Sequence, residues 1–219
     1  MHMNQAGRAD ERLVGEAAAA TEGGLSLALA DEVRRVRYDD PCAAAVLGAG
    51  LAEMLARCFR PGTEELVLLC IGTDRSTGDA LGPLVGRAVL ALQPRGLRVY
   101  GTLDAPVHAS NLATAVDTMG SNVCMVAVDA CLGRLETVGQ IAVASGPLLP
   151  GAGVNKQLPA VGRLHITGTV NVGGFMEYFV LQNTRLALVV RMAEVIAQGV
   201  ALAVDSLPAA AQVATAGGA

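Results

Sequence analysis

The stretch Leu66–Gly86, LVLLCIGTDRSTGDALGPLVG, decides the fold of this chain. It opens with the apolar run Leu66–Ile71, which has the length and composition of a buried strand. The sequence then breaks at Gly72 into a polar loop, and it becomes apolar again with helical spacing from Ala80. A strand, a loop and a helix in this order predict the first βα unit of an α/β fold. Ligands of such folds bind beyond the carboxyl ends of the strands, where this loop must lie.

The loop after this strand concentrates polar chemistry between Thr73 and Asp79, with two carboxylates, a guanidinium and several hydroxyls. Asp79 is the first candidate for a functional residue, because it stands where the loop turns into the helix. Taken alone, it is equally well explained as an acid that interacts favourably with a helix N-terminus. Its role therefore depends on what else reaches the same place.

The composition bounds the class of protein. The chain has 219 residues, of which 52% are hydrophobic and 16% charged, and this length predicts one α/β domain with extra material at its ends. A net charge of −4 does not favour a nucleic-acid binder. We find no run of about 18 uncharged apolar residues that would predict a membrane span, and the N-terminal residues lack the apolar core of a signal peptide.

The five cysteines lie in apolar segments and show no Cys-x-x-Cys spacing. This pattern indicates buried, reduced thiols of a cytoplasmic protein, and it favours neither a zinc site nor a disulfide framework.

Apolar periodicity predicts the remaining elements. Residues 1–24 and 206–219 lack it, so we expect both ends to be disordered and dispensable, and residues 25–205 to form a single domain. The expected elements are a short helix over 25–36, a helix over 41–59 that Asp40 and Pro41 begin, a helix over 80–92, a strand over 97–103, a helix over 111–119, strands over 123–128, 138–144 and 164–170, and one long helix over 175–204.

Two aspartates hold the same kind of position in this pattern. Asp79 follows the first strand, and Asp129 ends the strand Val123–Val128, whose continuous apolar run is typical of a strand covered on both faces. If the two strands are neighbours, both carboxylates reach one cleft. Two carboxylates that lie within a few ångström of each other cannot both ionise easily, so they share a proton. One can then activate water while the other, protonated, polarises a carbonyl. Turn or cap roles explain each aspartate singly, whereas the pair favours catalysis.

Five further residues lie in loops at or near the carboxyl ends of predicted strands, and we expect them to line the same cleft as substrate contacts. Arg75 can clamp a substrate carboxylate, and Lys156 lies in the Gly/Pro-rich loop Leu148–Pro159, although both residue types are common on surfaces. The candidates are Asp74, Arg75, Asp104, Lys156 and Asn171.

Two other chemistries fit the sequence less well. Asp104 stands where a ribose-binding acid would lie, but Gly72-Thr73-Asp74 breaks the Rossmann pattern, and Asp79 follows Gly78 where a P-loop needs lysine.

Cysteine catalysis would pair Cys131 with His108 or His165. A buried cysteine beside a strand is more often a packing residue. His165 alternates with Ile166 along a strand, as a core histidine does.

Several long motifs, taken together, resemble one known family. Over residues 40–198 and in this order, they resemble the YyaC family of bacterial sporulation proteins, which is similar to the germination protease and to the hydrogenase maturation proteases. The motifs are GTDRSTGDALGPLVG, GTLDAPVHASNL, VDACLG, GPLLPGAGVNKQLPAVG and ITGTVNVGGFMEYFVLQNTRL.

The resemblance implies a phosphorylase/hydrolase-like fold, a three-layer α/β/α sandwich. DALGP with Asp79 and VDA with Asp129 resemble the two segments that hold the catalytic aspartates of the germination protease, and PGAGVNK resembles a further stretch of it. The implied function is a cytoplasmic peptidase of the forespore or mother cell that cleaves a sporulation or spore protein. The alternative is a non-catalytic sporulation protein that binds a partner or a small ligand in the same cleft.

The maturation proteases bind nickel through a Glu, an Asp and a His. Asp79 and Asp129 match the two acids, but the histidine position falls at Asn171, a poor replacement for imidazole. We therefore expect no metal and no cofactor. The expected partner is a protein or peptide substrate, with no nucleic acid and no membrane. A homo-oligomer is left open, and the zymogen control of the germination protease need not carry over.

Overall fold

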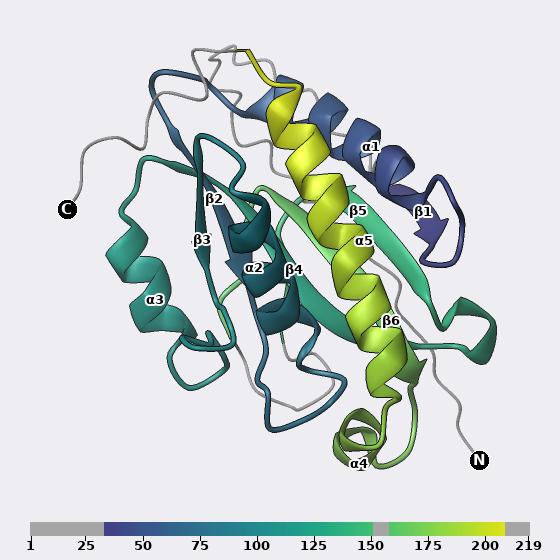
Figure 1. Cartoon of the computed structure of the whole chain (residues 1–219). Coiled ribbons are helices and arrows are strands. Elements are labelled where there is room, and N and C mark those ends of the chain that lie inside the picture. The colour runs from purple at the N-terminus through teal and green to yellow at the C-terminus, as the bar shows by residue number, and fades with distance from the viewer. Residues whose placement is uncertain (1–32, 151–157, 209–219) are drawn as a thin grey trace, which may run out of the picture.

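The computed structural model describes residues 33–150 and 158–208, and these build a sheet with helices on both faces (Figure 1). The predicted strand–loop–helix unit is confirmed as β2 followed by α2. In chain order the elements are β1 (Val33–Arg37), α1 (Ala43–Cys58), β2 (Glu65–Cys70), α2 (Leu81–Leu92), β3 (Leu97–Tyr100), α3 (Leu112–Met119), β4 (Val123–Gly133), a 3-10 turn (Leu135–Thr137), β5 (Gln140–Ser145), β6 (Leu164–Val172), α4 (Glu177–Gln182) and α5 (Leu186–Asp205).

The strands of the described chain form one mixed sheet in the order β1-β5-β6-β4-β2-β3. Strands β6, β4, β2 and β3 run parallel to one another, whereas β5 and β1 are antiparallel to their neighbours. The chain passes from β2 to β3 on one side and then returns to β4 on the other side. The carboxyl ends of β2 and β4 therefore lie at a reversal of strand order, where open α/β sheets bind their ligands.

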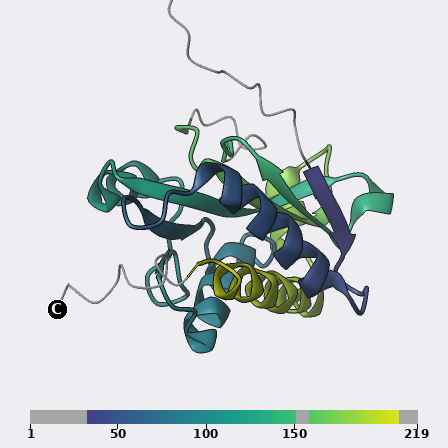
Figure 2. The same ribbon diagram turned by 90° about the horizontal axis from the view of Figure 1, so that it is seen from above.

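Alternate residues of β2 enter two different cores. Leu66 and Leu68 pack with residues of α1, α2 and α5 on one face of the sheet. Val67 and Leu69 pack on the other face with Leu112 of α3 and with the segment around 148 and 161. Figure 2 shows α1 and α5 side by side on one side of the sheet. The expected α/β/α layering is confirmed, with helices unevenly divided between the faces.

Helix α5 is long and apolar enough to cross a membrane, but half of its most apolar window is buried within the protein. It packs against α1 and α2, and small residues let it approach α1 closely. A Cβ atom added at Gly48 of α1 would lie 2.9 Å from the carbonyl oxygen of Gly199. Helix packing therefore accounts for the apolar composition of α5.

Two expected elements are wrong. Residues 33–36 belong to β1, because they pair with the edge of β5 from Val33 opposite Ala144 onward; residues 25–32 lie outside the described residues. The long helix expected over 175–204 is two helices, α4 and α5, separated at residues 183–185. Apolar spacing continues across that break, so periodicity alone could not reveal it.

The expected ends of the domain lie mostly outside the described residues, which begin at residue 33 and stop at 208. Leu207, which the sequence places in the tail, packs in the core and is 8% exposed.

Candidate active site

A cavity of about 500 Å³ lies beyond the carboxyl ends of β2 and β4, and both Asp79 and Asp129 line it. The structure thus brings together the two aspartates that the sequence singled out, from segments 50 residues apart (129 minus 79). Most of the other lining residues are apolar. They are Ile71, Gly72, Thr73, His108, Ala109, Ala130, Cys131, Leu132, Leu148, Leu149, Pro150, Leu158, Thr167, Glu177, Tyr178 and Leu181.

A tight backbone turn places Asp79. Gly72 has φ +147°, and a Cβ atom added to it would lie 1.9 Å from the carbonyl oxygen of Asp79. Thr73 N donates a hydrogen bond to that same oxygen over 3.1 Å. Helix α2 begins against the strand end, because a Cβ atom at Gly82 would lie 2.0 Å from Ile71 O. Glycine at positions 72 and 82 is therefore required to fold the loop back onto β2.

Asp79 is partly buried, and this burial raises the pKa of its carboxyl group above the ordinary value. The nearby Ser76 hydroxyl opposes part of the rise. Ser76 itself is buried, and its Oγ has no hydrogen-bond partner among the described residues, so it lies close to Asp79 without hydrogen-bond geometry.

Asp129 lies inside β4 and does not end it, which corrects the sequence-based expectation. Pairing of β4 with β2 stops at Val128 opposite Cys70, but pairing with β6 continues to Gly133 with a register shift after Cys131. Asp129 is thus the first residue of β4 without a partner on β2. Its side chain lines the cavity beyond the end of β2.

Burial raises the pKa of Asp129 to about 8. The Ala130 N–H lowers it in part, since it donates to Asp129 Oδ1 over 2.8 Å, and the negative charge of Asp79 raises it further. Part of the residue's surface stays open to the cavity. Asp129 therefore holds a proton at neutral pH, and Oδ2 is the oxygen left to carry it.

The predicted substrate contacts that lie within the described residues are not part of the cavity lining. Asp74 and Arg75 are exposed at the tip of the loop after β2, and Asp104 is exposed in the turn after β3. Lys156 lies outside the described residues. A loop at a strand end can point away from the sheet axis, and the sequence does not fix its direction.

Asn171 has a structural role instead. Its Nδ2 donates to Val180 O and to Thr184 Oγ1, each over 3.2 Å, and its Oδ1 accepts from Val172 N over 2.8 Å. It therefore fixes the end of β6 to the junction between α4 and α5.

Sequence reasoning missed Thr167, Glu177, Tyr178 and Leu181 as lining residues. Three of these come from α4, whose position over the cavity depends on the break before α5. The aromatic cluster in GGFMEYF was the only local signal for that segment.

The structure does not favour catalysis by Cys131 with a histidine partner. Cys131 and His108 both line the cavity, but burial raises the pKa of the Cys131 thiol, which disfavours the reactive thiolate. His108 Nδ1 accepts from Ser110 N, and no hydrogen bond joins its ring to Cys131 within the described chain. His165 lies elsewhere, with Nδ1 2.9 Å from Gly146 O, as expected for a satisfied core histidine.

The described residues do not fit the nickel site of the maturation proteases. Asn171 is absent from the cavity lining, and its side chain hydrogen-bonds to α4. No group of three His, Cys, Asp or Glu suited to a metal occurs in residues 33–150 and 158–208. The part of the chain that the structure describes therefore offers Asp79 and Asp129 no third metal ligand.

A family model described as "Protein of unknown function (DUF1256)" matches residues 35–199. A protein of Bacillus subtilis (strain 168) described as "Uncharacterized protein YyaC" is 48% identical over 184 residues, which cover 83% of this chain and 88% of that protein. The resemblance to the YyaC family is thereby confirmed. Among solved structures, the [NiFe] hydrogenase maturation protease HycI from Thermococcus kodakarensis KOD1 is similar with a TM-score of 0.49 and 17% identity, covering 71% of this chain and 99% of that chain.

Proposed function

The chain belongs to the DUF1256 family, and from this premise we propose that it is a peptidase that hydrolyses a sporulation or spore protein through Asp79 and Asp129. We place this activity in the cytoplasm of a sporulating bacterium, in the forespore or the mother cell. The five free cysteines agree with a reducing compartment. The resemblance of DALGP and VDA to the aspartate segments of the germination protease supports the reaction type.

One observation carries the proposal. Two carboxyl groups from separate segments line one cavity, no lysine or arginine lines it among the described residues, and the pKa of both is raised. Structural carboxylates normally gain a cation or several hydrogen bonds, which lower the pKa. A pair whose pKa values are raised in a cleft is the arrangement expected of an acid and a base.

The different surroundings of the two groups assign their roles. Asp129 is protonated at neutral pH and donates a hydrogen bond from Oδ2 to the oxygen of the scissile carbonyl. Asp79, whose ionised form the Ser76 hydroxyl favours, accepts a proton from water as the water oxygen bonds to the carbonyl carbon. The tetrahedral intermediate then breaks its C–N bond, and the proton held by Asp79 passes to the leaving amine.

The test is to find new chain ends. The full chain and its Asp79→Asn and Asp129→Asn variants are each incubated with protein extracted from developing spores, and new N-termini are identified by mass spectrometry. We expect a defined set of cleavage sites with the wild type that is absent with both variants. Identical sets from all three proteins would mean that a contaminating protease cleaves and would overturn the assignment.

A complete lack of cleavage by the wild type, together with a protein retained by all three forms, would favour the alternative. The same cleft would then bind a partner without chemistry.

A further inference from the structure

Aromatic residues are scarce in this chain and concentrated at one exposed place. The sequence has three Phe, three Tyr and no Trp, and three of these six aromatic residues lie between positions 175 and 179. Phe175 is 85% exposed, Tyr178 57% and Phe179 52%. The rings of Tyr178 and Phe179 stack edge to face, 5.9 Å apart. Exposed aromatic clusters of this kind mark sites of interaction with other proteins.

This surface is continuous with the cavity. Tyr178 is exposed and also lines the cavity, and Leu181, one turn further along α4, lines it too and is half-buried. Leu149, 66% exposed, lines it from the loop after β5. We call Phe175, Tyr178, Phe179 and Leu149 the aromatic rim. An apolar path thus leads from the rim to the two aspartates.

The charge that the described residues place beside the rim is negative. Glu177 lines the cavity next to Tyr178, and no Lys or Arg lines it within the described chain. Glu177 Oε1 accepts from Gly174 N over 3.1 Å, and Glu177 forms no ion pair with a described residue. A ligand with a positive charge beside an apolar group would match both features, whereas an acidic ligand would be repelled.

The shape favours a polypeptide over a small molecule. Part of the rim lies outside the enclosed space, because Phe175 and Phe179 are exposed and do not line the cavity, whereas Tyr178 and Leu149 do. A ligand that contacts both the rim and the aspartates must extend from the surface into the cavity, as a stretch of chain with successive side chains does.

We propose that the aromatic rim docks a polypeptide segment in which a large apolar residue is adjacent to a lysine or arginine. The apolar side chain packs on Phe175 and Tyr178, and the basic group pairs with Glu177. This inference rests on the proposed function, since it names the class of substrate segment that reaches Asp79 and Asp129.

Three short, capped, fluorescently labelled peptides of Gly and Ser test the proposal, with Leu-Lys, Leu-Glu or Ser-Lys at the centre. Binding to the full-length Asp129→Asn variant is measured by fluorescence anisotropy, so that cleavage does not interfere. We expect the Leu-Lys peptide to bind about tenfold more tightly than either of the others. Its advantage over Leu-Glu should shrink at high salt, because the rim charge is screened. Equal affinity for all three peptides would overturn the proposal.

Matched variants in the same background locate the contact. Phe175→Ser should weaken Leu-Lys binding about fivefold or more. Glu177→Gln keeps an acceptor for Gly174 N and should remove the preference for Leu-Lys over Leu-Glu. Leu92→Ser is the control, since Leu92 is similarly exposed, at 49%, at the far end of α2. Equal weakening by Leu92→Ser, or none by Phe175→Ser, would count against the rim.

A second copy of this chain could also cover the rim. Analytical sedimentation would then show that the wild type is a dimer. If Phe175→Ser dissociated this dimer and the Leu-Lys peptide did not, the rim would be a dimer interface and the proposal would be overturned.

Failure of this inference can be told from failure of the proposed function. Selective binding of Leu-Lys without any cleavage by the wild type would leave docking intact and remove the peptidase. Cleavage of spore proteins at sites that lack an apolar–basic pair would keep the peptidase and remove this docking rule.

Discussion

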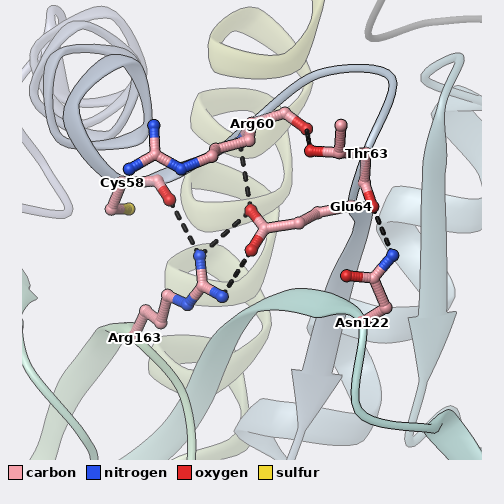
Figure 3. A network of polar contacts seen from close by, with 6 residues as sticks. All are labelled: Cys58, Arg60, Thr63, Glu64, Asn122 and Arg163. Atoms are coloured by element: carbon pink, nitrogen blue, oxygen red, sulfur yellow. Dashed lines mark hydrogen bonds and ion pairs between the residues drawn. The ribbon is translucent and has the colours of Figure 1, made fainter.

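Carboxyl groups at the two ends of the sheet have pKa values shifted in opposite directions. At the amino end, before β2 and β6, Glu64 is paired with Arg163, and this ion pair lowers the pKa of Glu64 (Figure 3). At the carboxyl end, Asp79 and Asp129 face a cavity that no Lys or Arg of the described residues lines, and burial raises the pKa of both. The first arrangement favours a charged group that holds the structure together, and the second keeps a group ready to exchange protons.

The paired end joins the neighbouring elements α1 and β2 to β6, which is distant from both in sequence. Arg163 Nη2 donates to Glu64 Oε1 over 2.5 Å, while Nη1 donates to Glu64 Oε2 over 3.0 Å and to Cys58 O over 2.9 Å. Arg60 N also donates to Glu64. The end of α1 and the starts of β2 and β6 are thus held together (Figure 3). Both carboxylate oxygens of Glu64 have hydrogen-bond partners there, in contrast to Ser76 Oγ beside Asp79, which has none among the described residues.

Substitutions at the two ends of the sheet should differ most in their effect on peptidase activity. Asp79→Asn and Asp129→Asn should each lower cleavage by roughly 10³-fold or more, because each removes the base or the acid. The double variant should be little worse than either single one, since the two groups act as a unit. Rates of cleavage of one identified substrate measure this. Glu64→Gln is the control and should retain activity. Additive losses in the double variant would contradict a coupled pair.

Stability should respond to pH in the direction that a raised pKa dictates. Unfolded Asp129 loses its proton near 3.8, whereas the folded protein retains it until about pH 8. Unfolding therefore releases a proton between these values, and stability falls as pH rises through this range, by on the order of a few kcal/mol.

The variant Asp129→Asn removes this dependence. It should match the wild type near pH 4 and be more stable at pH 8 and above, as measured by thermal or urea unfolding at both pH values. A variant less stable than the wild type at pH 8 would indicate an ordinary capping aspartate.

Asn171 lies at the carboxyl end of β6, yet unlike the two aspartates its side chain has three hydrogen-bond partners. Asn171→Ala removes three hydrogen bonds at the junction of β6, α4 and α5, and should cost about 1–3 kcal/mol of stability. Urea unfolding measures this. Arg75→Ala, at an exposed position of the same end, should change stability little. Unchanged stability of Asn171→Ala would return Asn171 to the list of ligand-binding candidates.

The smallest effect is expected at the paired end. Glu64→Gln should lower stability by about 0.5–1 kcal/mol at pH 7, since Arg163 is 43% exposed and water screens much of the attraction. The folded pKa of Glu64 is lowered, so its contribution is present above the unfolded pKa and is lost as pH falls below it. Wild type and variant should therefore converge in acid. A difference that grows in acid would contradict the ion pair.

Local sequence determined the βα unit and the two aspartates. The change from an apolar strand to a polar loop and then to a helical repeat is written in neighbouring residues, so Leu66–Gly86 predicts β2, α2 and the place of Asp79. The continuous apolar run before Asp129 likewise predicted a central strand. Both predictions succeeded because burial on two faces and helical spacing are properties of short segments.

Only the tertiary structure decided the position of Asp129 within its strand and the raised pKa of the aspartates. Asp129 lies within β4 because β6 continues beside it after β2 has turned away, and its raised pKa comes from segments that the chain brings over it. The same holds for α4, which supplies Tyr178 to the cavity, and for Asn171, which bonds to α4 and does not line the cavity. Register, burial and proton affinity depend on neighbours distant in sequence, and local pattern does not contain them.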